Sequence, residues 1–488
     1  MTKIQDEEFL NLEPHDVLRN FFKISQIFSR RPDNTQGISD YLADFGRRLG
    51  LDVYQDESTN VIIKKPATAG YEQAPTVMLA AHMDMICAVN PGVIHDFDNS
   101  PLNLLLDDDM DTVRADGTTL GADCGLGMAF ILSVLESHTI MHPAIEAVFT
   151  TNEETDMKGA QNLHYERLQS KIILSLDAAR LALGGAGELE IELFLDRKKQ
   201  PPVNGNVQVR ISISGLLGGH SGKDAYVERG NAITLLSRVL SDIQQRKKVP
   251  LYIGEFQGGY ETACAFARTA TCVISFPAER KREIEEAVKE WDERYHNELE
   301  VPDPKVRLTM ETMTSTEEVC DKDSTDRLLT LLTILPDGIC SLHKYFDHRC
   351  ETSVNLGVVE TEDQGFKIIT CIRSAIAAKK YYQFDKIRRI CNLMGVRYQI
   401  LHDLPEWKYI GDSRLVKTIE GIYADLLPDV AQGTCEQGIF LANMQGAEAV
   451  GIGPRVNSPH SPNEYFSLLE AAEDWDRFLQ VLKVLKNY

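Results

Sequence analysis

Several patterns that would place the chain in a particular class are missing from its sequence. No stretch approaches the ~20 consecutive apolar residues that a membrane-spanning helix needs. The opening residues, MTKIQDEEFL, lack the basic segment and apolar core of a secretory signal peptide. The chain has 10 cysteines but no C-x-x-C pair, which favours reduced thiols over a disulfide framework. We therefore expect a cytoplasmic protein.

An excess of basic residues is also missing. The chain has 51 Lys and Arg against 73 Asp and Glu, a net charge of −22. This balance disfavours binding to nucleic acid or to an anionic membrane surface, so we expect neither as a partner. Its 488 residues, 43% hydrophobic and 25% charged, are typical of a globular protein too long for a single core.

Alternation of short apolar runs with helices indicates an α/β domain with a largely buried sheet. We expect two amphipathic helices within 12–50 and a further helix over 125–137. Strands are expected at 61–63, 77–80, 145–149 and 172–176. The same alternation of strands and helices returns near residue 400, where we expect helices over 413–427 and 467–485 and a strand over 448–453.

The middle of the chain has a different pattern of apolar and polar residues. Residues 188–194 and 207–213 alternate apolar and polar side chains, as half-exposed antiparallel strands do. We expect helices over 231–246 and 277–297 and a hairpin over 353–373. The sequence thus predicts one α/β domain, formed by 1–187 and 398–488, interrupted by an α+β domain over 188–397.

Acidic and histidine residues follow successive strands of the predicted α/β domain. Because strand ends of an open α/β sheet meet in one crevice, these side chains should converge. The convergent residues are His82, Asp84, Asp123, Glu153, Glu154, Asp177 and His460. So many carboxylates cannot share a crevice without cations, and imidazole with carboxylate suits zinc or another divalent transition metal.

Each of these motifs has a plainer interpretation when taken alone. His82-Met83-Asp84 could be a polar strand end, and Asp123 could simply cap a helix. The glycines around Asp123 could suggest phosphate binding, but the lysine of a P-loop is missing. Glu153-Glu154 could be a solvated edge, and His460 a loop residue. Their order after successive strands is what favours a shared metal site.

At this point the sequence resembles a known family. The segments AHMDM, GTTLGADCGLGMA, TNEET, LSLDA and HSPNE, with GLLGGHSG and ETSVNLGVV in the insert, resemble the bacterial aminoacyl-histidine (Xaa-His) dipeptidases. These are carnosinase-like peptidase D enzymes of the di-zinc superfamily that includes aminoacylases, carboxypeptidase G and peptidase T. The resemblance implies a di-zinc catalytic domain, with a mixed sheet flanked by helices, interrupted by a lid and dimerisation domain.

The resemblance also implies roles for the convergent residues. Asp123 would bridge two divalent metal ions, with zinc as the first candidate and manganese or cobalt as the alternatives. His82 and Asp177 would complete one metal site, and Glu154 and His460 the other. Asp84 would hold the His82 ring, and Glu153 would be the general base that takes a proton from a bridging water.

In the insert, the resemblance implies two residues that contact the substrate. His220 would stabilise the developing oxyanion in the active site of a dimer partner, and Arg373 would bind the substrate carboxylate. Without the resemblance, His220 is more simply a turn histidine and Arg373 an exposed strand arginine. The implied partners are a dipeptide and a second copy of the chain, joined through the lid domain.

Several positions depart from the family pattern on the substrate side. Thr262 replaces an asparagine, Gln432 replaces a histidine, and Ala178–Arg180 replaces an acidic segment. Because every metal position is kept, we expect metal-dependent hydrolysis of dipeptides, of Xaa-His type. The alternatives are a related di-zinc amidohydrolase acting on tripeptides or N-acyl amino acids, and a non-catalytic binding protein on the same scaffold.

Overall fold

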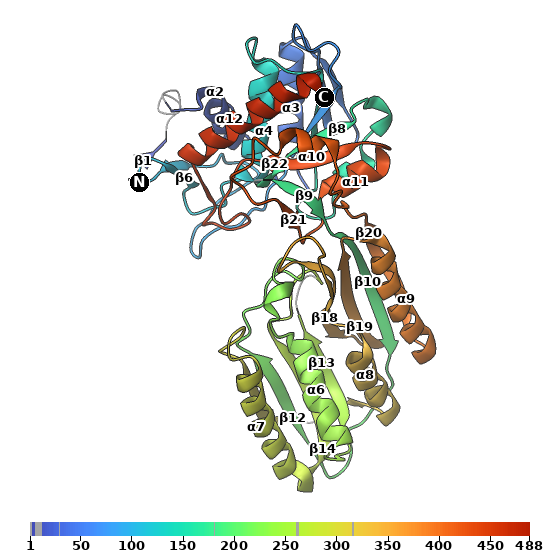
Figure 1. The fold of residues 1–488 in the computed structure, drawn as a ribbon. Helices are drawn as coiled ribbons and strands as arrows, with labels where there is room; N and C mark the ends of the chain where they lie inside the picture. Colours follow the sequence, from blue (N-terminus) through green and yellow to red (C-terminus); the bar gives the residue numbers. More distant parts are fainter. Residues whose placement is uncertain (1, 5–11, 29, 180, 260–262, 315–316) are drawn as a thin grey trace. The chain divides into compact units, whose positions relative to one another are not determined.

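The computed structural model describes residues 2–4, 12–28, 30–179, 181–259, 263–314 and 317–488 (Figure 1). The chain forms two compact units. The first comprises Met1–Gly184, Tyr409–Val430 and Glu436–Tyr488, and the second comprises Gly185–Lys408 and Ala431–Cys435. The second unit therefore extends past the boundary predicted at residue 397, and the chain returns to it once more at 431–435.

The first unit is built on an eight-stranded mixed sheet in the order β2-β3-β7-β4-β8-β22-β9-β21. Its middle strands are parallel: β7 (Ile145–Thr150), β4 (Val77–His82), β8 (Ile172–Ala179) and β22 (Glu448–Gly453). The antiparallel strands β2 (Asp52–Gln55), β3 (Val61–Lys65) and β9 (Ala182–Gly185) extend it, and β21 (Asp429–Ala431) lies beside β9 at the edge. The carboxyl ends of the parallel strands thus lie along one edge of the sheet.

Helices cover this sheet, as its apolar strands require. In the main hydrophobic core, alternate residues of the strands pack against four helices: α2 (His15–Ser25), α3 (Gln36–Arg48), α4 (Ala122–Glu136) and α12 (Leu468–Val484). The intervening residues of β4 and β7 are buried too, so both faces of these strands are covered. The α/β architecture predicted from the alternating apolar runs is confirmed.

One predicted helix is shorter than expected. The apolar periodicity favoured a helix over 413–427, but α10 spans only Arg414–Ile419 and gives way to turns. Gly421 follows directly, and a glycine inside a helix costs about 1 kcal/mol relative to alanine. A smaller sheet in the order β1-β5-β6-β23, formed by Thr2–Lys3, Leu104–Leu106, Thr112–Ala115 and Tyr465–Ser467, was not expected.

The second unit is built on an antiparallel sheet in the order β15-β12-β14-β13-β18-β19-β10-β20. The strands are β10 (Gly187–Asp196), β12 (Asn206–Ser214), β13 (Tyr252–Gly258), β14 (Ala270–Pro277), β15 (Arg307–Thr312), β18 (Cys350–Thr361), β19 (Gly365–Ser374) and β20 (Arg397–Leu404), with β17 (Gly338–Leu342) paired to β18. The predicted hairpin is β18–β19.

Helices of the second unit cover one face of its sheet (Figure 1). They are α6 (Ala232–Gln245), α7 (Lys281–Glu298), α8 (Lys322–Ile334) and α9 (Ala377–Met394). On β10, Leu189, Ile191 and Leu193 point into this core, and the alternate residues face the opposite side. This alternation explains the half-polar pattern of 188–194.

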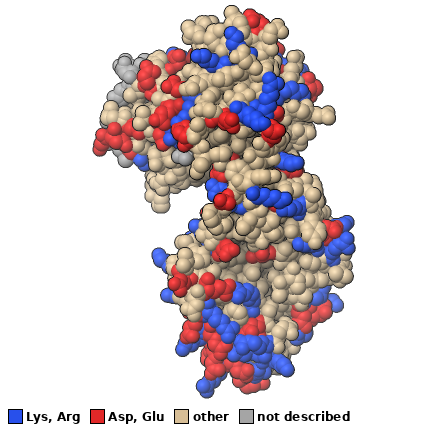
Figure 2. All heavy atoms as spheres, viewed as in Figure 1, with Lys and Arg blue, Asp and Glu red and all other residues tan. Residues whose placement is uncertain are grey.

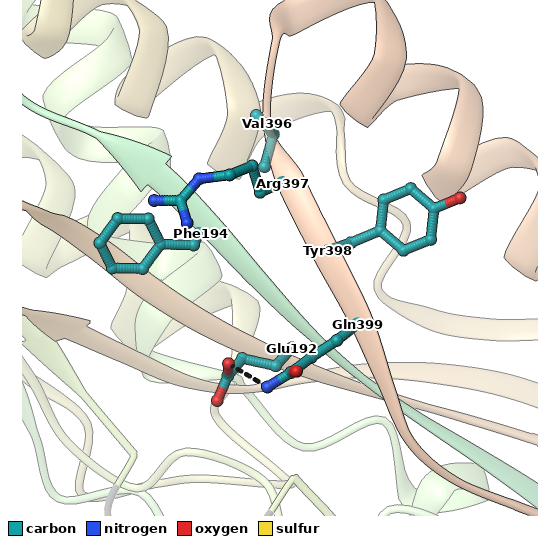
Figure 3. Close-up of a pocket in the computed structure, with 6 residues that line it drawn as sticks. All are labelled: Glu192, Phe194, Val396, Arg397, Tyr398 and Gln399. Carbon is teal, nitrogen blue, oxygen red and sulfur yellow. Dashed lines mark hydrogen bonds between the residues drawn. The ribbon is translucent and has the colours of Figure 1, made fainter.

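The open face carries a hollow of about 570 Å³ between β10 and β20 (Figure 3). Figure 3 shows Arg397 over the ring of Phe194, at 4.4 Å from the ring centroid, and Gln399 bonded to Glu192 at 2.7 Å. None of the residues singled out from the sequence lines this hollow.

Acidic and basic side chains are interspersed over the visible face of each unit (Figure 2). The net charge of −22 is thus not gathered into one patch on this face. Within the described residues, no helix has the length and apolar character needed to cross a bilayer.

Candidate metal centre

Strands β4 and β8 place a histidine and an aspartate side by side at their carboxyl ends. His82 is the last residue of β4 and is fully buried. Its Nε2 lies 3.2 Å from Oδ1 of Asp123 and 3.3 Å from Oδ1 of Asp177. Burial alone would lower the pKa of His82, but hydrogen bonds to the two aspartates outweigh it and raise the pKa.

A second histidine approaches Asp123 from the other side. Nε2 of His460 lies 3.2 Å from Oδ2 of Asp123 and 3.0 Å from Oε2 of Glu154. Hydrogen bonds to these two carboxylates raise the pKa of His460 to about 10. Asp123 therefore presents one oxygen to each imidazole, and the five residues form two groups of three that share Asp123.

The donor set fits divalent cations. Each group offers one imidazole nitrogen and two carboxylates, a combination that suits zinc and its neighbours in the transition series. Oε1 of Glu154 is buried, and none of the described residues donates a hydrogen bond to it. A buried carboxylate oxygen without a donor is costly, and a cation would satisfy it. These residues could hold two ions with Asp123 between them.

Cys124 also lies near this centre, beside His82 and Asp177. Its thiol donates to the backbone oxygen of Leu176 at 3.5 Å, and burial raises its pKa well above the usual range. A protonated, buried thiol is neither a good ligand nor a nucleophile.

Asp84 contacts two parts of the centre. Nδ1 of His82 lies 3.0 Å from the backbone oxygen of Asp84 and 3.7 Å from its carboxylate. The ring is therefore held mainly by the backbone, although the resemblance had assigned this role to the residue as a whole. The Asp84 carboxylate instead accepts the backbone N–H groups of Glu153 and Glu154, each at 3.1 Å. It fixes the turn that carries both glutamates.

Glu153 and Glu154 differ in their contacts. Glu154 lies against His460, whereas no hydrogen bond or ion pair engages the Glu153 carboxylate within the described part of the chain. Burial, followed by the charge of Asp177, raises the pKa of Glu153 well above its usual range.

Two buried glutamates near this centre were given no role from the sequence. Glu464 accepts hydrogen bonds from the backbone of the Asp123 turn. Glu436 accepts a hydrogen bond from Thr150 at 2.8 Å, and burial raises its pKa to about 8. Glu464 lies in the HSPNE segment that carried the resemblance, but a carboxylate that binds backbone has no pattern of its own in a sequence.

In the second unit, Arg373 is 5% exposed and already paired. Its Nη1 lies 2.5 Å from Oε2 of Glu188 and 3.0 Å from the hydroxyl of Thr434, and its Nε donates to Ser221 at 3.3 Å. Arg373 is therefore not the exposed strand arginine that the plainer interpretation described.

His220 has a defined tautomer in the second unit. Its Nδ1 accepts the backbone N–H groups of Gly222 at 3.0 Å and Lys223 at 3.1 Å. The ring proton must then reside on Nε2, which can donate. The ring lies beside Gly433 of the same chain, where a Cβ would sit 3.7 Å from its Cε1.

The structure describes only some of the positions that depart from the family pattern. The backbone oxygen of Gln432 packs against Gly222, where a Cβ would lie 1.9 Å from it. Thr262 and Arg180 lie outside the described residues, and Ala178 and Ala179 are described only as the end of β8.

Comparisons with known proteins agree with this geometry. Residues 78–484 match the peptidase family M20/M25/M40. The chain is 29% identical to the cytosol non-specific dipeptidase of Escherichia coli (strain K12), over 98% of this chain and 99% of the relative.

Solved structures resemble the whole chain. The crystal structure of an aminoacylhistidine dipeptidase from Vibrio alginolyticus matches with a TM-score of 0.84 and 29% identity, covering 97% of each chain. A tripeptidase from Staphylococcus aureus, at 17% identity and a TM-score of 0.56, shares the fold over 98% of this chain and 100% of that one. The resemblance stated from the sequence motifs is confirmed, and the chain belongs to peptidase family M20/M25/M40.

Proposed function

We propose that the protein is a metal-dependent dipeptidase that hydrolyses the peptide bond of dipeptides, including those of Xaa-His type. The observation that carries this proposal is the pair of imidazoles, each facing two carboxylates with Asp123 in common. A peptidase family and a paired donor set together favour hydrolysis over mere binding.

Five residues would hold two divalent ions, with zinc the first candidate and manganese and cobalt the alternatives. His82 and Asp177 serve one ion, Glu154 and His460 the other, and Asp123 both. When bound, such ions polarise a peptide carbonyl and make water more acidic.

Glu153 is the general base in this proposal. Its carboxylate is free of protein partners within the described residues, and the Asp84 carboxylate fixes its backbone. It accepts a proton from the attacking water and delivers that proton to the nitrogen of the leaving amine. Glu154, already in contact with His460, acts as a ligand.

Two residues of the second unit would bind the substrate. The Nε2–H of His220 donates to the oxygen that becomes negative when the carbonyl is attacked. Arg373, whose guanidinium Glu188 and Thr434 hold in place through Nη1, would bind the substrate carboxylate. We propose further that the protein is a cytoplasmic homodimer joined through its second unit.

A substrate panel tests this function. We expect the metal-loaded protein to hydrolyse dipeptides, Xaa-His among them, faster than tripeptides and acetyl-amino acids. The relative from Vibrio alginolyticus is named for aminoacylhistidine substrates and the one from Escherichia coli as non-specific, so the panel must contain dipeptides with several carboxyl-terminal residues. Faster turnover of tripeptides or acetyl-amino acids would contradict the proposal.

A further inference from the structure

Glu464 binds the turn that carries Asp123. Its Oε2 accepts the backbone N–H groups of Leu120 at 2.8 Å and Gly121 at 2.9 Å. Its Oε1 accepts those of Ala122 at 2.9 Å and Asp123 at 3.1 Å. The side chain is 2% exposed, so these four donors replace water around its charge.

Glu464 also belongs to the loop that carries His460. That loop is short between the two residues, and the backbone N–H of Glu464 donates to the oxygen of Ser461 at 3.0 Å. One carboxylate therefore connects the loop of one histidine to the turn of the shared aspartate.

Arg30 makes the matching connection from the other side. This residue lies between α2 and α3 and is 3% exposed. Its Nε donates to the oxygen of Met83 at 3.0 Å, directly after His82, and its Nη1 donates to the oxygen of Gly121 at 3.1 Å. A Cβ at Gly121 would lie 2.9 Å from Nη1, so glycine lets the guanidinium approach.

We propose that Glu464 and Arg30 are positioning residues that hold the segments of His82, Asp123 and His460 at the spacing that two metal ions require. The two side chains bind opposite polarities of one turn: Glu464 takes its N–H groups, and Arg30 takes a carbonyl. Neither side chain needs to touch an ion to act. This inference rests on the proposed metal-dependent function.

The chemistry of the four N–H donors makes Glu464→Gln a sharp test. An amide has one acceptor oxygen, so its NH₂ group would face two backbone N–H donors. The turn must then shift or leave donors unpaired, while the metal-ligating side chains stay unchanged. Loss of an outer partner of a ligand typically weakens metal binding about 10- to 100-fold.

Glu146→Gln is the matched control. Glu146 is also 2% exposed and accepts backbone N–H groups, those of Gln169 at 2.9 Å and Ser170 at 3.0 Å. It lies near the amino end of β7, whereas the glutamate pair follows the carboxyl end of that strand. The control therefore removes the same charge and the same kind of bond away from the candidate metal centre.

The experiment measures zinc affinity by competition with a chromophoric chelator, and the absorption spectrum of the cobalt-loaded protein. Thermal unfolding of the metal-free proteins reports the fold. We expect Glu464→Gln to lose about 10- to 100-fold in zinc affinity and to change the cobalt spectrum, while Glu146→Gln retains both. Equal zinc affinity in the two variants would overturn the inference.

A second variant decides the case if Glu464→Gln does not fold. Arg30→Lys keeps the positive charge but loses the planar fork that reaches two carbonyls. We expect weakened zinc binding again, and unchanged affinity would contradict the inference. If the wild-type protein itself binds no zinc, manganese or cobalt, the proposed function fails instead.

Discussion

The two units each contain a buried cluster of charged side chains, and the clusters differ in how their charges are balanced. In the first unit, three carboxylates face two imidazoles, and Oε1 of Glu154 has no donor among the residues that the structure describes. In the second, Glu188 lies between a guanidinium at 2.5 Å, the His402 ring at 2.7 Å and the Thr434 hydroxyl at 3.0 Å.

Both clusters contain groups that could bind a metal, but only the first cluster needs a cation to balance its carboxylates. In the second unit Arg373 supplies the positive charge that a cation would bring, so Glu188 is already satisfied. Within the described part of the first unit, no arginine or lysine is paired with the shared Asp123. Proximity of ligand-type residues is therefore a weaker sign of a metal than an unbalanced buried charge.

Removing metal should have the largest effect. We expect chelation to abolish peptide hydrolysis, and zinc, manganese or cobalt to restore it, because the ions would polarise the peptide carbonyl and make the attacking water more acidic. Activity assays before and after metal stripping, with reconstitution, provide the measurement. Full activity of the metal-stripped protein would contradict the claim that the first cluster binds metal and the second does not.

Changing Glu153 should have the next largest effect. Glu153→Gln keeps the shape but removes the proton acceptor, so turnover should fall by about 10²- to 10⁴-fold, the usual contribution of a general base. Metal content should stay at the wild-type level, because Glu154 is the glutamate that contacts His460. Loss of an ion from this variant would reverse the roles of the two residues.

Changing His220 separates the roles of the two units. Removing an oxyanion donor costs about 3 kcal/mol, so His220→Ala should lower kcat by roughly 10²-fold without changing metal content. On the role that the resemblance assigns, mixing inactive His220→Ala and Glu153→Gln subunits should restore activity at one site of each hybrid dimer. Verified hybrids as inactive as their parents would show that His220 acts within its own subunit or has no catalytic part.

Breaking the second cluster should affect stability rather than metal binding. Burial alone would raise the pKa of Glu188, but Arg373 and His402 outweigh it and lower the pKa to about 2. A depressed folded-state pKa means that the charge of Glu188 stabilises the fold above about pH 4.3, by roughly 3 kcal/mol. This contribution is lost as pH falls toward 2.

Urea unfolding of metal-free Glu188→Gln and wild type measures this contribution. The variant should be less stable at pH 7, and the difference should shrink at pH 3. A difference that does not depend on pH would show that the carboxylate charge is not what balances Arg373.

The sequence predicted most of the first cluster because its residues follow strands in order. His82 ends β4, Glu154 follows β7, and Asp177 lies within β8, so apolar runs mark each position. Parallel pairing of those strands then brings the side chains together. This part of the prediction needed only two observations: the apolar runs that mark the strands, and the polar residue that follows each run.

Other features could not be predicted because they depend on backbone contacts across long separations. Glu464 and Arg30 bind backbone groups of Gly121 that are distant in sequence, and neither contact leaves a pattern. Strand β20 was assigned to the first domain, because its pairing with β10 depends on register and not on composition. The pairing of Arg373 with Glu188 likewise follows from strand β10 lying beside β19.

Metal stoichiometry tests the central claim most directly. The contrast between the clusters predicts two divalent ions per chain in the wild-type protein and in Glu188→Gln, and strongly reduced content in Asp123→Ala, because Asp123 presents one oxygen to each imidazole. Elemental analysis of the three purified proteins, loaded with zinc and freed of excess, gives the values. Equal zinc content in wild type and Asp123→Ala, or loss of zinc from Glu188→Gln, would contradict the account.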